Sequence, residues 1–434
     1  MPNIFDNLEV ITPDNQRVPV LLQDRNSLAL ATEAIARIAT LENIKIVTPQ
    51  MFGAVGDGVN DDTQAIVNAI ATGNTVYFPA GRYRITSTLN LPAGANLIGQ
   101  LTPLTTGNQF GATILHDGDG DTINVPNYNP FSISNIMIDK TNSTNGNGIN
   151  VELVDGFIIN NVKVRNHNNG IRIVGCSYGI IEKCTCENNY NDGFYFSNNA
   201  TLNVCQVQIS NSLSELNDGC GFHFVTQRPT MPVGRFDHNM TFANHHGGVV
   251  YESTDNSYYV TGIRINGCFI GGDDTLGGIY VNATNYPVVI DNCYIEMSGV
   301  DHNGRNYATA PSGYGNNIAV RDAIGGVAIS NSVLCASAES GLSISNANNH
   351  VSVVNCVFKN NGVSQSAGVV QKSDILITDG DAIISDCIFN ETPTGVYVYT
   401  NNDVRIIGNK FSNTTPIISG NNTTIKFNIG VVDN

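Results

Sequence analysis

Carboxylates and histidines that could perform acid–base chemistry crowd into one part of this 434-residue chain, between residues 192 and 274. Two carboxyl groups can cleave a glycosidic bond with retention when they lie about 5–5.5 Å apart, or with inversion at roughly 6.5–9.5 Å. Like charges at these separations raise the pKa of one group and so create the acid. The pattern predicts a general acid–base set of Asp192, Asp218 and Glu252, with His223 as an alternative proton carrier.

Further polar and aromatic side chains surround these four in the sequence and could hold a substrate. Tyrosine rings offer flat faces for sugar rings, and arginines lie at the flanks. The predicted substrate-binding residues are Arg172, Tyr195, Glu215, His245, His246, Asp273, Asp274, Tyr280 and Arg321. The two adjacent histidines could suggest a metal, but no third ligand follows at a metal-binding spacing, so we predict no metal and no cofactor.

Each of these candidates also has a purely structural interpretation. Asp192 and Asp218 directly precede glycines, as turn residues often do. His223 could simply stack on its neighbours, and Glu215 could form ion pairs with Arg165. The sequence leaves these alternatives open.

A series of short strands, each led by a glycine, must position the candidate residues. Its members are Gly170-Ile-Arg-Ile, Gly193-Phe-Tyr-Phe, Gly221-Phe-His-Phe, Gly248-Val-Val-Tyr, Gly278-Ile-Tyr-Val, Gly341-Leu-Ser-Ile and Gly395-Val-Tyr-Val. Strand alternation points the first residue after each glycine inward and the second outward. In a parallel stack the outward residues form one column at steps of about 4.8 Å. We expect this column to contain Arg172, Tyr195, His223, Val250, Tyr280, Ala319 and Ser343.

A second repeated pattern joins two short strands at an Asn or Asp. It is clearest as VVIDNCYI at 288–295, VSVVNCVF at 351–358 and AIISDCIF at 382–389. Asn tolerates left-handed backbone angles, so the pattern predicts a sharp corner, and stacked amides could bond from coil to coil. The corner residues are Asn135, Asn161, Asn211, Asn292, Asn331, Asn355 and Asp386. Recurrence every few tens of residues indicates a solenoid, here of about 11–12 coils with three strands each.

The most specific motif lies near the start of these repeats. FGAVGDGVNDDTQAI at 52–66, followed by VYFPAGRYRI at 76–85, resembles the opening of the pectate-lyase-like superfamily, in the form found in phage tailspikes and alginate epimerase modules. The resemblance implies an all-β fold, a right-handed single-stranded parallel β-helix with a capping helix, which we expect at Thr63–Ala71. It also implies a substrate cleft over the glycine-led strands. We expect Asp57, Asp61 and Asp62 to serve as turn and cap residues rather than ligands.

These patterns divide the chain into three parts. Residues 1–46 form an N-terminal attachment or neck segment with a short helix at Ser27–Glu42, residues 47–112 the opening of the β-helix and the capping helix, and residues 113–434 the β-helix body. Insertions at 226–237, 298–315 and 362–373 are expected to wall a groove over the glycine-led strands, because insertions on one face of a solenoid usually mark its binding face.

Composition excludes several classes of partner. With a formal net charge of -16 and 21 Lys+Arg, the chain has no basic patch for nucleic acid. No apolar run is long enough to insert into a membrane, and no signal peptide follows Met1, so we expect synthesis in a host cytoplasm. The ten cysteines lack paired CxxC spacing and are expected to be reduced, buried side chains.

Three hypotheses about function follow. The resemblance first implies a tailspike-like, receptor-binding depolymerase. It would be an endo-acting hydrolase of a bacterial surface polysaccharide, a homotrimer, and attached to a virion tail or baseplate through residues 1–46. The second hypothesis is a lyase or epimerase acting on uronic acids, but residues 166–177 (NHNNGIRIVGCS) lack the Tyr and Asp of the epimerase motif. The third is a non-catalytic glycan-binding spike, since β-helices also serve that role.

Overall fold

The computed structural model describes most of the chain beyond residue 45, and two short strands before it. The described residues are 9–11, 17–19, 46–101, 111–126, 128–141, 144–198, 207–226, 235–253, 263–273, 275–284, 287–298, 315–323, 325–345, 350–362, 373–399, 403–412, 414–418, 423–426 and 428. The chain divides into two compact units, Met1–Val47 and Thr48–Asn434. In the first, β1 (Glu9–Ile11) pairs antiparallel with β2 (Arg17–Pro19). The helix predicted at Ser27–Glu42 lies outside the described residues.

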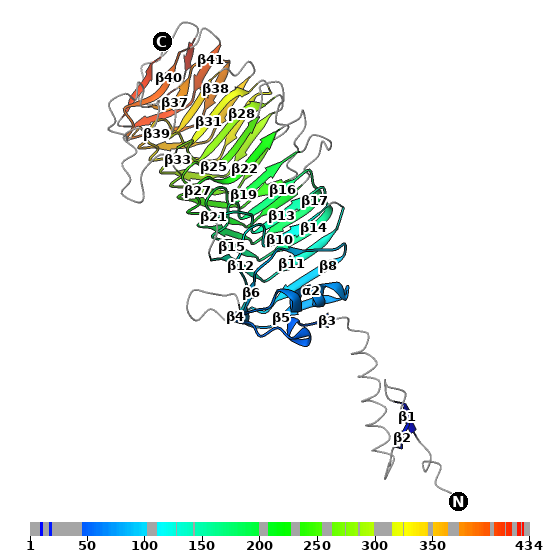
Figure 1. Ribbon diagram of the computed structural model, residues 1–434. Coiled ribbons are helices and arrows are strands. Elements are labelled where there is room, and N and C mark those ends of the chain that lie inside the picture. Colours follow the sequence, from blue (N-terminus) through cyan, green and yellow to red (C-terminus); the bar gives the residue numbers. More distant parts are fainter. Residues whose placement is uncertain are drawn as a thin grey trace, which may run out of the picture. The chain divides into compact units, whose positions relative to one another are not determined.

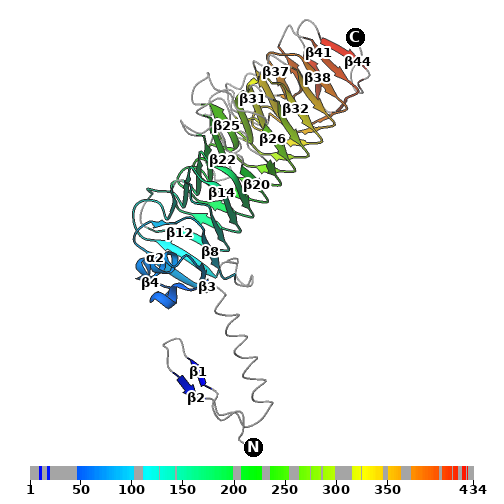
Figure 2. The same cartoon turned by 90° about the vertical axis from the view of Figure 1, so that its right-hand side faces the viewer.

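The second unit is a right-handed parallel β-helix, as predicted, built from three long parallel sheets. Each coil contributes one strand to each sheet, so neighbours within a sheet are about one coil apart in sequence. Figure 1 shows the coils stacked in chain order, and Figure 2 shows the stack from a second side. A side chain's place is therefore fixed by its sheet, its coil and its direction in the strand.

Sheet 1 precedes the Asn corners. From β5 onward it contains β5 (Thr75–Phe78), β8 (Ala95–Gly99), β11 (Phe131–Ser134), β14 (Asp155–Asn160), β17 (Ser177–Glu182), β20 (Val207–Ser210), β23 (Arg235–Asp237), β26 (Ile263–Asn266), β29 (Val288–Asp291), β32 (Val327–Ser330), β35 (Val351–Val354), β38 (Ala382–Ser385), β41 (Val404–Ile407) and β44 (Thr423–Lys426).

Sheet 2 follows the corners. It contains β4 (Asp57–Asp61), β6 (Gly81–Ile85), β9 (Ala112–His116), β12 (Met137–Lys140), β15 (Lys163–Arg165), β18 (Thr185–Glu187), β21 (Leu213–Glu215), β24 (Met240–Phe242), β27 (Phe269–Gly271), β30 (Tyr294–Glu296), β33 (Val333–Cys335), β36 (Val357–Lys359), β39 (Ile388–Asn390) and β42 (Lys410–Ser412).

Sheet 3 holds the glycine-led strands. It contains β7 (Leu89–Asn90), β10 (Ile123–Val125), β13 (Ile149–Glu152), β16 (Ile171–Val174), β19 (Phe194–Ser197), β22 (Cys220–Thr226), β25 (Gly247–Ser253), β28 (Ile279–Thr284), β31 (Ile318–Ala323), β34 (Leu342–Ser345), β37 (Ser373–Ile377), β40 (Thr394–Val398) and β43 (Thr415–Ile418).

The predicted coil number is too low. In the described part of the chain, sheet 2 has 14 strands and sheet 3 has 13. The shortfall arises because residues 47–112, treated above as a separate opening segment, already contribute full strands to the same continuous sheets. The corner motif is absent from these first coils, so counting corners missed them.

Left-handed backbone angles define the corners between sheets 1 and 2. All seven predicted corner residues have positive φ values between 50° and 60°. Their amides form part of the expected ladder: Asn161 Nδ2 donates to Asn135 Oδ1 at 2.8 Å, and Asn355 Nδ2 donates to Asn331 Oδ1 at 2.8 Å. The corner prediction is therefore confirmed.

The N-terminal end of the solenoid is covered by a 3-10 turn, η1 (Pro49–Phe52), and by α2 at Thr63–Ala71, the predicted range. Helix α2 packs on β5 and η1 through its buried Ile66, Ala69 and Ile70. The Asp62 carboxylate does not cap this helix but accepts the backbone N–H groups of Val55 and Gly56 at 2.7 and 3.0 Å.

Nine cysteines lie in the described residues, and all nine are free thiols; eight are buried, and Cys335 is half-buried. This agrees with the prediction of reduced, core-filling side chains. None of the described helices is long and apolar enough to cross a membrane. Most of each predicted groove-walling insertion, at 226–237, 298–315 and 362–373, lies outside the described residues.

Candidate functional site

The outward column predicted for the glycine-led strands exists on sheet 3. Strand register pairs Arg172 with Tyr195, Tyr195 with His223, and His223 with Val250. Beneath the column, the inward rings of Phe194 and Phe222 are fully buried and stack at 4.5 Å. Packing below and hydrogen bonds along the sheet therefore fix the height and direction of each outward side chain.

His223 on β22 is clamped between two carboxylates from neighbouring coils. Its Nδ1 lies 2.8 Å from Asp192 Oδ2, and its Nε2 lies 3.0 Å from Glu252 Oε1. Asp192 comes just before β19, and Glu252 lies near the end of β25. The Asp192 side chain is 3% exposed, that of His223 15% and that of Glu252 38%, so this Asp192–His223–Glu252 cluster opens to solvent at Glu252.

The cluster keeps a proton on the imidazole at neutral pH. Burial alone would lower the pKa of His223, but the hydrogen bonds and charges of Asp192 and Glu252 outweigh it and raise the pKa to about 9. In turn, the hydrogen bond from His223 lowers the pKa of Glu252 below its usual value. The arrangement at neutral pH is an imidazolium that donates from both nitrogens, beside an ionised Glu252.

Asp192 is held by the coil that carries His223. Its Oδ1 accepts the backbone N–H of Cys220 at 2.7 Å, while its Oδ2 faces the imidazole. A Cβ on Gly219 would lie 2.4 Å from Asp192 Oδ1, so glycine at this position leaves room for the carboxylate. The Gly219-Cys220 pair, which the sequence interpretation did not use, therefore shapes the site.

The structure does not bring Asp218 into this cluster. Its carboxylate pairs with His245 at 3.0 Å, and its side chain is 56% exposed. Both Asp192 and Asp218 were expected just before a glycine-led strand, but Asp192 directly precedes Gly193, whereas Asp218 lies three residues before Gly221, the glycine aligned with Gly193. Asp218 therefore lies two residues too early. His246 lies near Glu252, where its charge helps to lower the pKa of that carboxyl.

Two other acidic candidates occupy structural positions. Asp273 is fully buried, where it accepts bonds from the Asn244 amide at 2.9 Å and from the Thr241 hydroxyl at 2.5 Å. Glu215 lies on sheet 2 in register with Glu187, and burial together with that neighbouring charge raises the pKa of Glu215. Neither side chain faces sheet 3's outer surface. Asp274 lies outside the described residues.

Beyond His223 the column is covered rather than open. Val250, Tyr280 and Ala319, predicted to point into a groove, are buried in a small apolar cluster with Cys220 and Leu276. These side chains pack against one another and against Cys220 and Leu276, which do not belong to the outward column, and apolar side chains gain free energy from such burial.

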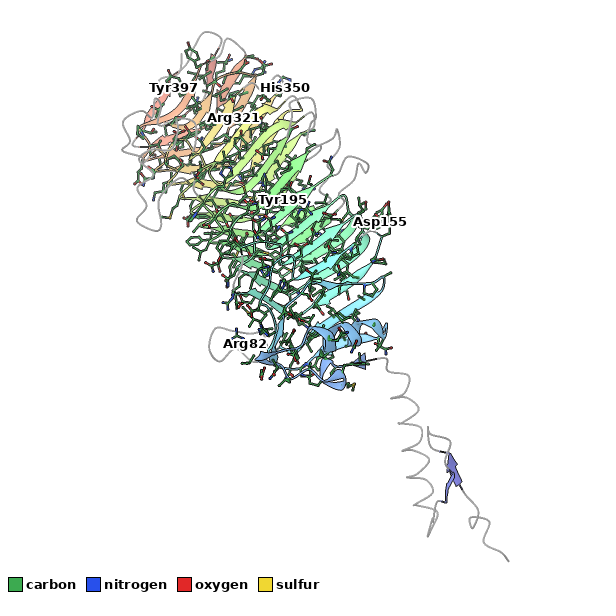
Figure 3. All side chains as sticks on the ribbon, in the orientation of Figure 1. Arg82, Asp155, Tyr195, Arg321, His350 and Tyr397 are labelled. Atoms are coloured by element: carbon green, nitrogen blue, oxygen red, sulfur yellow. The ribbon has the colours of Figure 1, made fainter. Side chains whose placement is uncertain are left out.

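Arginine–tyrosine contacts lie on both sides of the cluster. Arg321 lies 5.6 Å from the ring centre of the covered Tyr280, and Figure 3 places it well along the stack from Tyr195. Arg172 lies 5.9 Å from the ring centre of Tyr195, whose edge meets His223 at 5.6 Å between ring centres. Of the two predicted aromatic platforms, Tyr195 is therefore the one next to the cluster and only half-buried.

The described residues contain one group whose atoms are close enough to hold a metal ion. It consists of Asp192, Cys220 and His223, whose ligand atoms lie within 4.8 Å of one another. Burial raises the pKa of the Cys220 thiol well above its usual value, which disfavours the thiolate that a zinc ion binds. The geometry therefore favours proton exchange along Asp192–His223–Glu252.

A separate hollow of about 460 Å³ lies on sheet 1 and not beside His223. Its lining includes Phe157, Ile158, Tyr178 and Ile180, and contains no acid or histidine. It offers apolar surface without groups for acid–base chemistry, so the sheet 3 cluster is the stronger candidate.

Fold and site together define a β-helix protein with a hydrogen-bonded Asp–His–Glu cluster on one face. The family model described as "Rhamnogalacturonase A/epimerase, pectate lyase-like" matches residues 47–273, and the chain belongs to this family. That range includes all three residues of the cluster.

Individual relatives share shorter or more distant similarity. A capsule K30/K69-specific depolymerase of Klebsiella phage K64-1 is 29% identical over 137 residues, which is 30% of this chain but only 17% of that protein. Among solved structures, the bacteriophage phi29 gene product 12 has a TM-score of 0.62 at 16% identity, over 90% of this chain and 59% of that one. The Azotobacter vinelandii mannuronan C-5 epimerase AlgE6 A-module has a TM-score of 0.58 at 17% identity, over 89% and 100%. At these identities the structural matches establish the fold.

Proposed function

We propose that the chain is a tailspike-like, receptor-binding depolymerase that binds and hydrolyses glycosidic bonds of a bacterial surface polysaccharide, such as a capsule, O-antigen or exopolysaccharide. The observation that carries this proposal is the clamp of His223 between Asp192 and Glu252 on the outer face of sheet 3. The similarity to a phage capsule depolymerase supports the choice of substrate.

The three residues take different roles in this mechanism. Glu252, ionised and the most exposed, accepts a proton from the attacking water. His223, which carries a proton at neutral pH, exchanges its hydrogen bond to Glu252 for one to the departing sugar oxygen, and its Nε2 proton passes to that oxygen as the glycosidic C–O bond breaks. Asp192, almost fully buried, positions the imidazole and stabilises its charge. The proton gained by Glu252 then returns to His223 across their hydrogen bond.

The same electrostatics favour hydrolysis over elimination or epimerisation. Those reactions begin when a free base removes a proton from carbon. An imidazole with a pKa of about 9 is already protonated at neutral pH and cannot serve as that base. Glu252, whose pKa is lowered, is basic enough to assist a water molecule in hydrolysis but is a poor base for removing a proton from carbon. A lyase or epimerase acting on uronic acids remains the alternative.

Replacing the exposed carboxylate tests the proposal. Glu252→Gln should lower depolymerisation of a matching capsule or O-antigen at least about 100-fold, the usual scale for an acid–base group. Asp218→Asn is the matched control, because Asp218 pairs with His245 outside the cluster and should leave activity within about twofold of wild type. Products should be reducing sugars; an unsaturated uronate absorbance would instead identify a lyase. Glycan binding without cleavage of any polysaccharide would identify a non-catalytic spike.

Assembly and location form a second part of the proposal. We infer a homotrimer carried on a virion tail or baseplate through residues 1–46, since the phage relatives support a virion protein and the compact unit Met1–Val47 is separate from the β-helix. Light scattering should give three times the 46.4 kDa chain mass. A chain lacking residues 1–46 should still cleave polysaccharide but should fail to join phage particles; normal incorporation would contradict the assignment.

A further inference from the structure

The outer face of sheet 3 differs on the two sides of His223. Toward the N-terminus, register continues the column from Arg172 to Asn150, Asn124 and Asn90. Asn90 is exposed, Asn124 and Arg172 are half-buried and Asn150 is buried, whereas Val250, Tyr280 and Ala319 on the other side are all buried. The sequence interpretation missed these asparagines, although INV at 123–125 and INVE at 149–152 have the alternation of the glycine-led strands.

We propose that this face carries a one-sided track of subsites for an uncharged, hydroxyl-rich glycan, running from Asn90 to Tyr195 and ending at the Asp192–His223–Glu252 cluster. The proposal rests on the proposed function, because it assigns the substrate class and direction for the same site. The track spans five strand-to-strand steps of about 4.8 Å each, enough length for several sugar units.

Hydrogen-bonding capacity on the track matches sugar hydroxyls. Asn124 Nδ2 donates to Asn90 Oδ1 at 2.8 Å, and Asn150 Nδ2 donates to Asn124 Oδ1 at 3.1 Å. An amide has two N–H groups and two acceptor lone pairs, and this ladder uses only one of each at Asn124. The remaining donor and acceptor are held in fixed positions. At the end of the track, the half-buried ring of Tyr195 lies between Arg172 and His223.

A second amide row runs beside the first. Asn169 Nδ2 donates to Asn147 Oδ1 at 2.8 Å, and Asn191 Nδ2 donates to Asn169 Oδ1 at 2.9 Å. These residues precede β13, β16 and β19, so they border the track where its strands begin. The exposed Asn191 leads directly to Asp192 of the cluster.

Charge on the track argues for neutral sugars. Its one cation, Arg172, is bonded to Glu152 at 2.5 Å and to Asn150 at 2.7 Å. The guanidinium is therefore neutralised and positioned before any substrate arrives, and a chain with a net charge of -16 repels polyanions from its surface. A polyuronate would need an unpaired cation at each acidic sugar.

Two variants at matched positions test the track. Asn124 and Ser343 occupy the same outward column, each four coils from His223 and on opposite sides of it. Both would be changed to Leu in a full-length Glu252→Gln protein, so that binding is measured without cleavage. Affinity would be measured on an array of neutral capsular and O-antigen polysaccharides, with alginate and polygalacturonate as acidic probes.

We expect Asn124→Leu to weaken binding of a neutral polysaccharide at least about tenfold, while Ser343→Leu changes it less than twofold. Asn124→Ser, a smaller change, covers the case in which the leucine variant fails to fold, and should also weaken binding. Equal losses at both positions, or binding only to alginate or polygalacturonate, would overturn the inference. If Glu252→Gln cleaves as fast as wild type, the proposed function fails instead, and the binding asymmetry can still be judged.

Discussion

At the scale of single residues, the charge on His223 is the central property of the candidate site. Two carboxylates on opposite ring nitrogens make the imidazolium stable where burial alone would remove its proton. Catalysis and folding stability are then linked to the same titration, because a group whose pKa differs between folded and unfolded chains makes stability depend on pH.

The stability of the protein should therefore change on the alkaline side. Folding raises the pKa of His223 from 6.5 to about 9, so the stabilisation is complete below about pH 6.5 and is lost as the pH rises through about 9. Over this interval the unfolding temperature of wild type should fall relative to that of His223→Gln, which cannot titrate. Scanning calorimetry across the range measures this, and parallel curves for the two proteins would refute the clamp.

Asp192 should act on the reaction through His223. Asp192→Asn removes one of the two charges that hold the proton, so the pKa of His223 should fall. The alkaline limb of the pH–activity profile should shift to lower pH accordingly. Asp218→Asn, which changes an equivalent carboxylate outside the cluster, should leave the limb in place. A uniform loss of activity without a shift would mean that Asp192 only supports the fold.

The sequence was enough to predict which residue types form this site. It was only partly enough to predict which of those residues lie together. Alternation along the glycine-led strands correctly placed His223 in a column with Tyr195. Asp218 and Asp192 were grouped because both lie just before a glycine-led strand, yet Asp218 lies two residues earlier in its coil and pairs with His245 instead. Val250 and Tyr280 are buried by side chains from outside their strands. The inward–outward alternation of residues along a strand does not predict such packing.

At the scale of secondary-structure elements, the Asn corners determine how each coil turns. They were predictable because one local property, tolerance of a left-handed backbone, is needed at the same place in coil after coil. Asn331 contributes to its corner in two ways. Its backbone adopts a left-handed φ of 50°. Its side-chain amide donates a hydrogen bond to Asp291 and accepts one from Asn355.

Substitutions at Asn331 should separate the two contributions. Asn331→Ala loses the ladder bonds and places a Cβ in the left-handed region, which together should cost about 2–3 kcal/mol. Asn331→Gly loses the same bonds but keeps the backbone angle accessible, so it should cost about 1 kcal/mol less than alanine. Urea denaturation measures both values. Equal losses would mean that the backbone angle contributes nothing.

At the scale of the whole molecule, the β-helix is a one-dimensional stack in which each coil contacts mainly the coils above and below it. In such solenoids, a local loss of stability spreads to neighbouring repeats and fades with distance. The cap formed by α2 protects the first coils, which would otherwise expose apolar core and strand edges. Damage to this cap should therefore have a position-dependent effect along the stack.

Ile66→Ala should reveal this gradient. Ile66 lies on the buried side of α2, and its truncation should cost about 2–5 kcal/mol locally, whereas Val67→Ala on the exposed side of the same helix is the control. Hydrogen exchange followed by mass spectrometry should accelerate in β5 and β8 but remain near wild type in β38 and β41. Uniform acceleration along all coils would show that the molecule opens as a single cooperative unit, because a change at one end would then destabilise every coil alike.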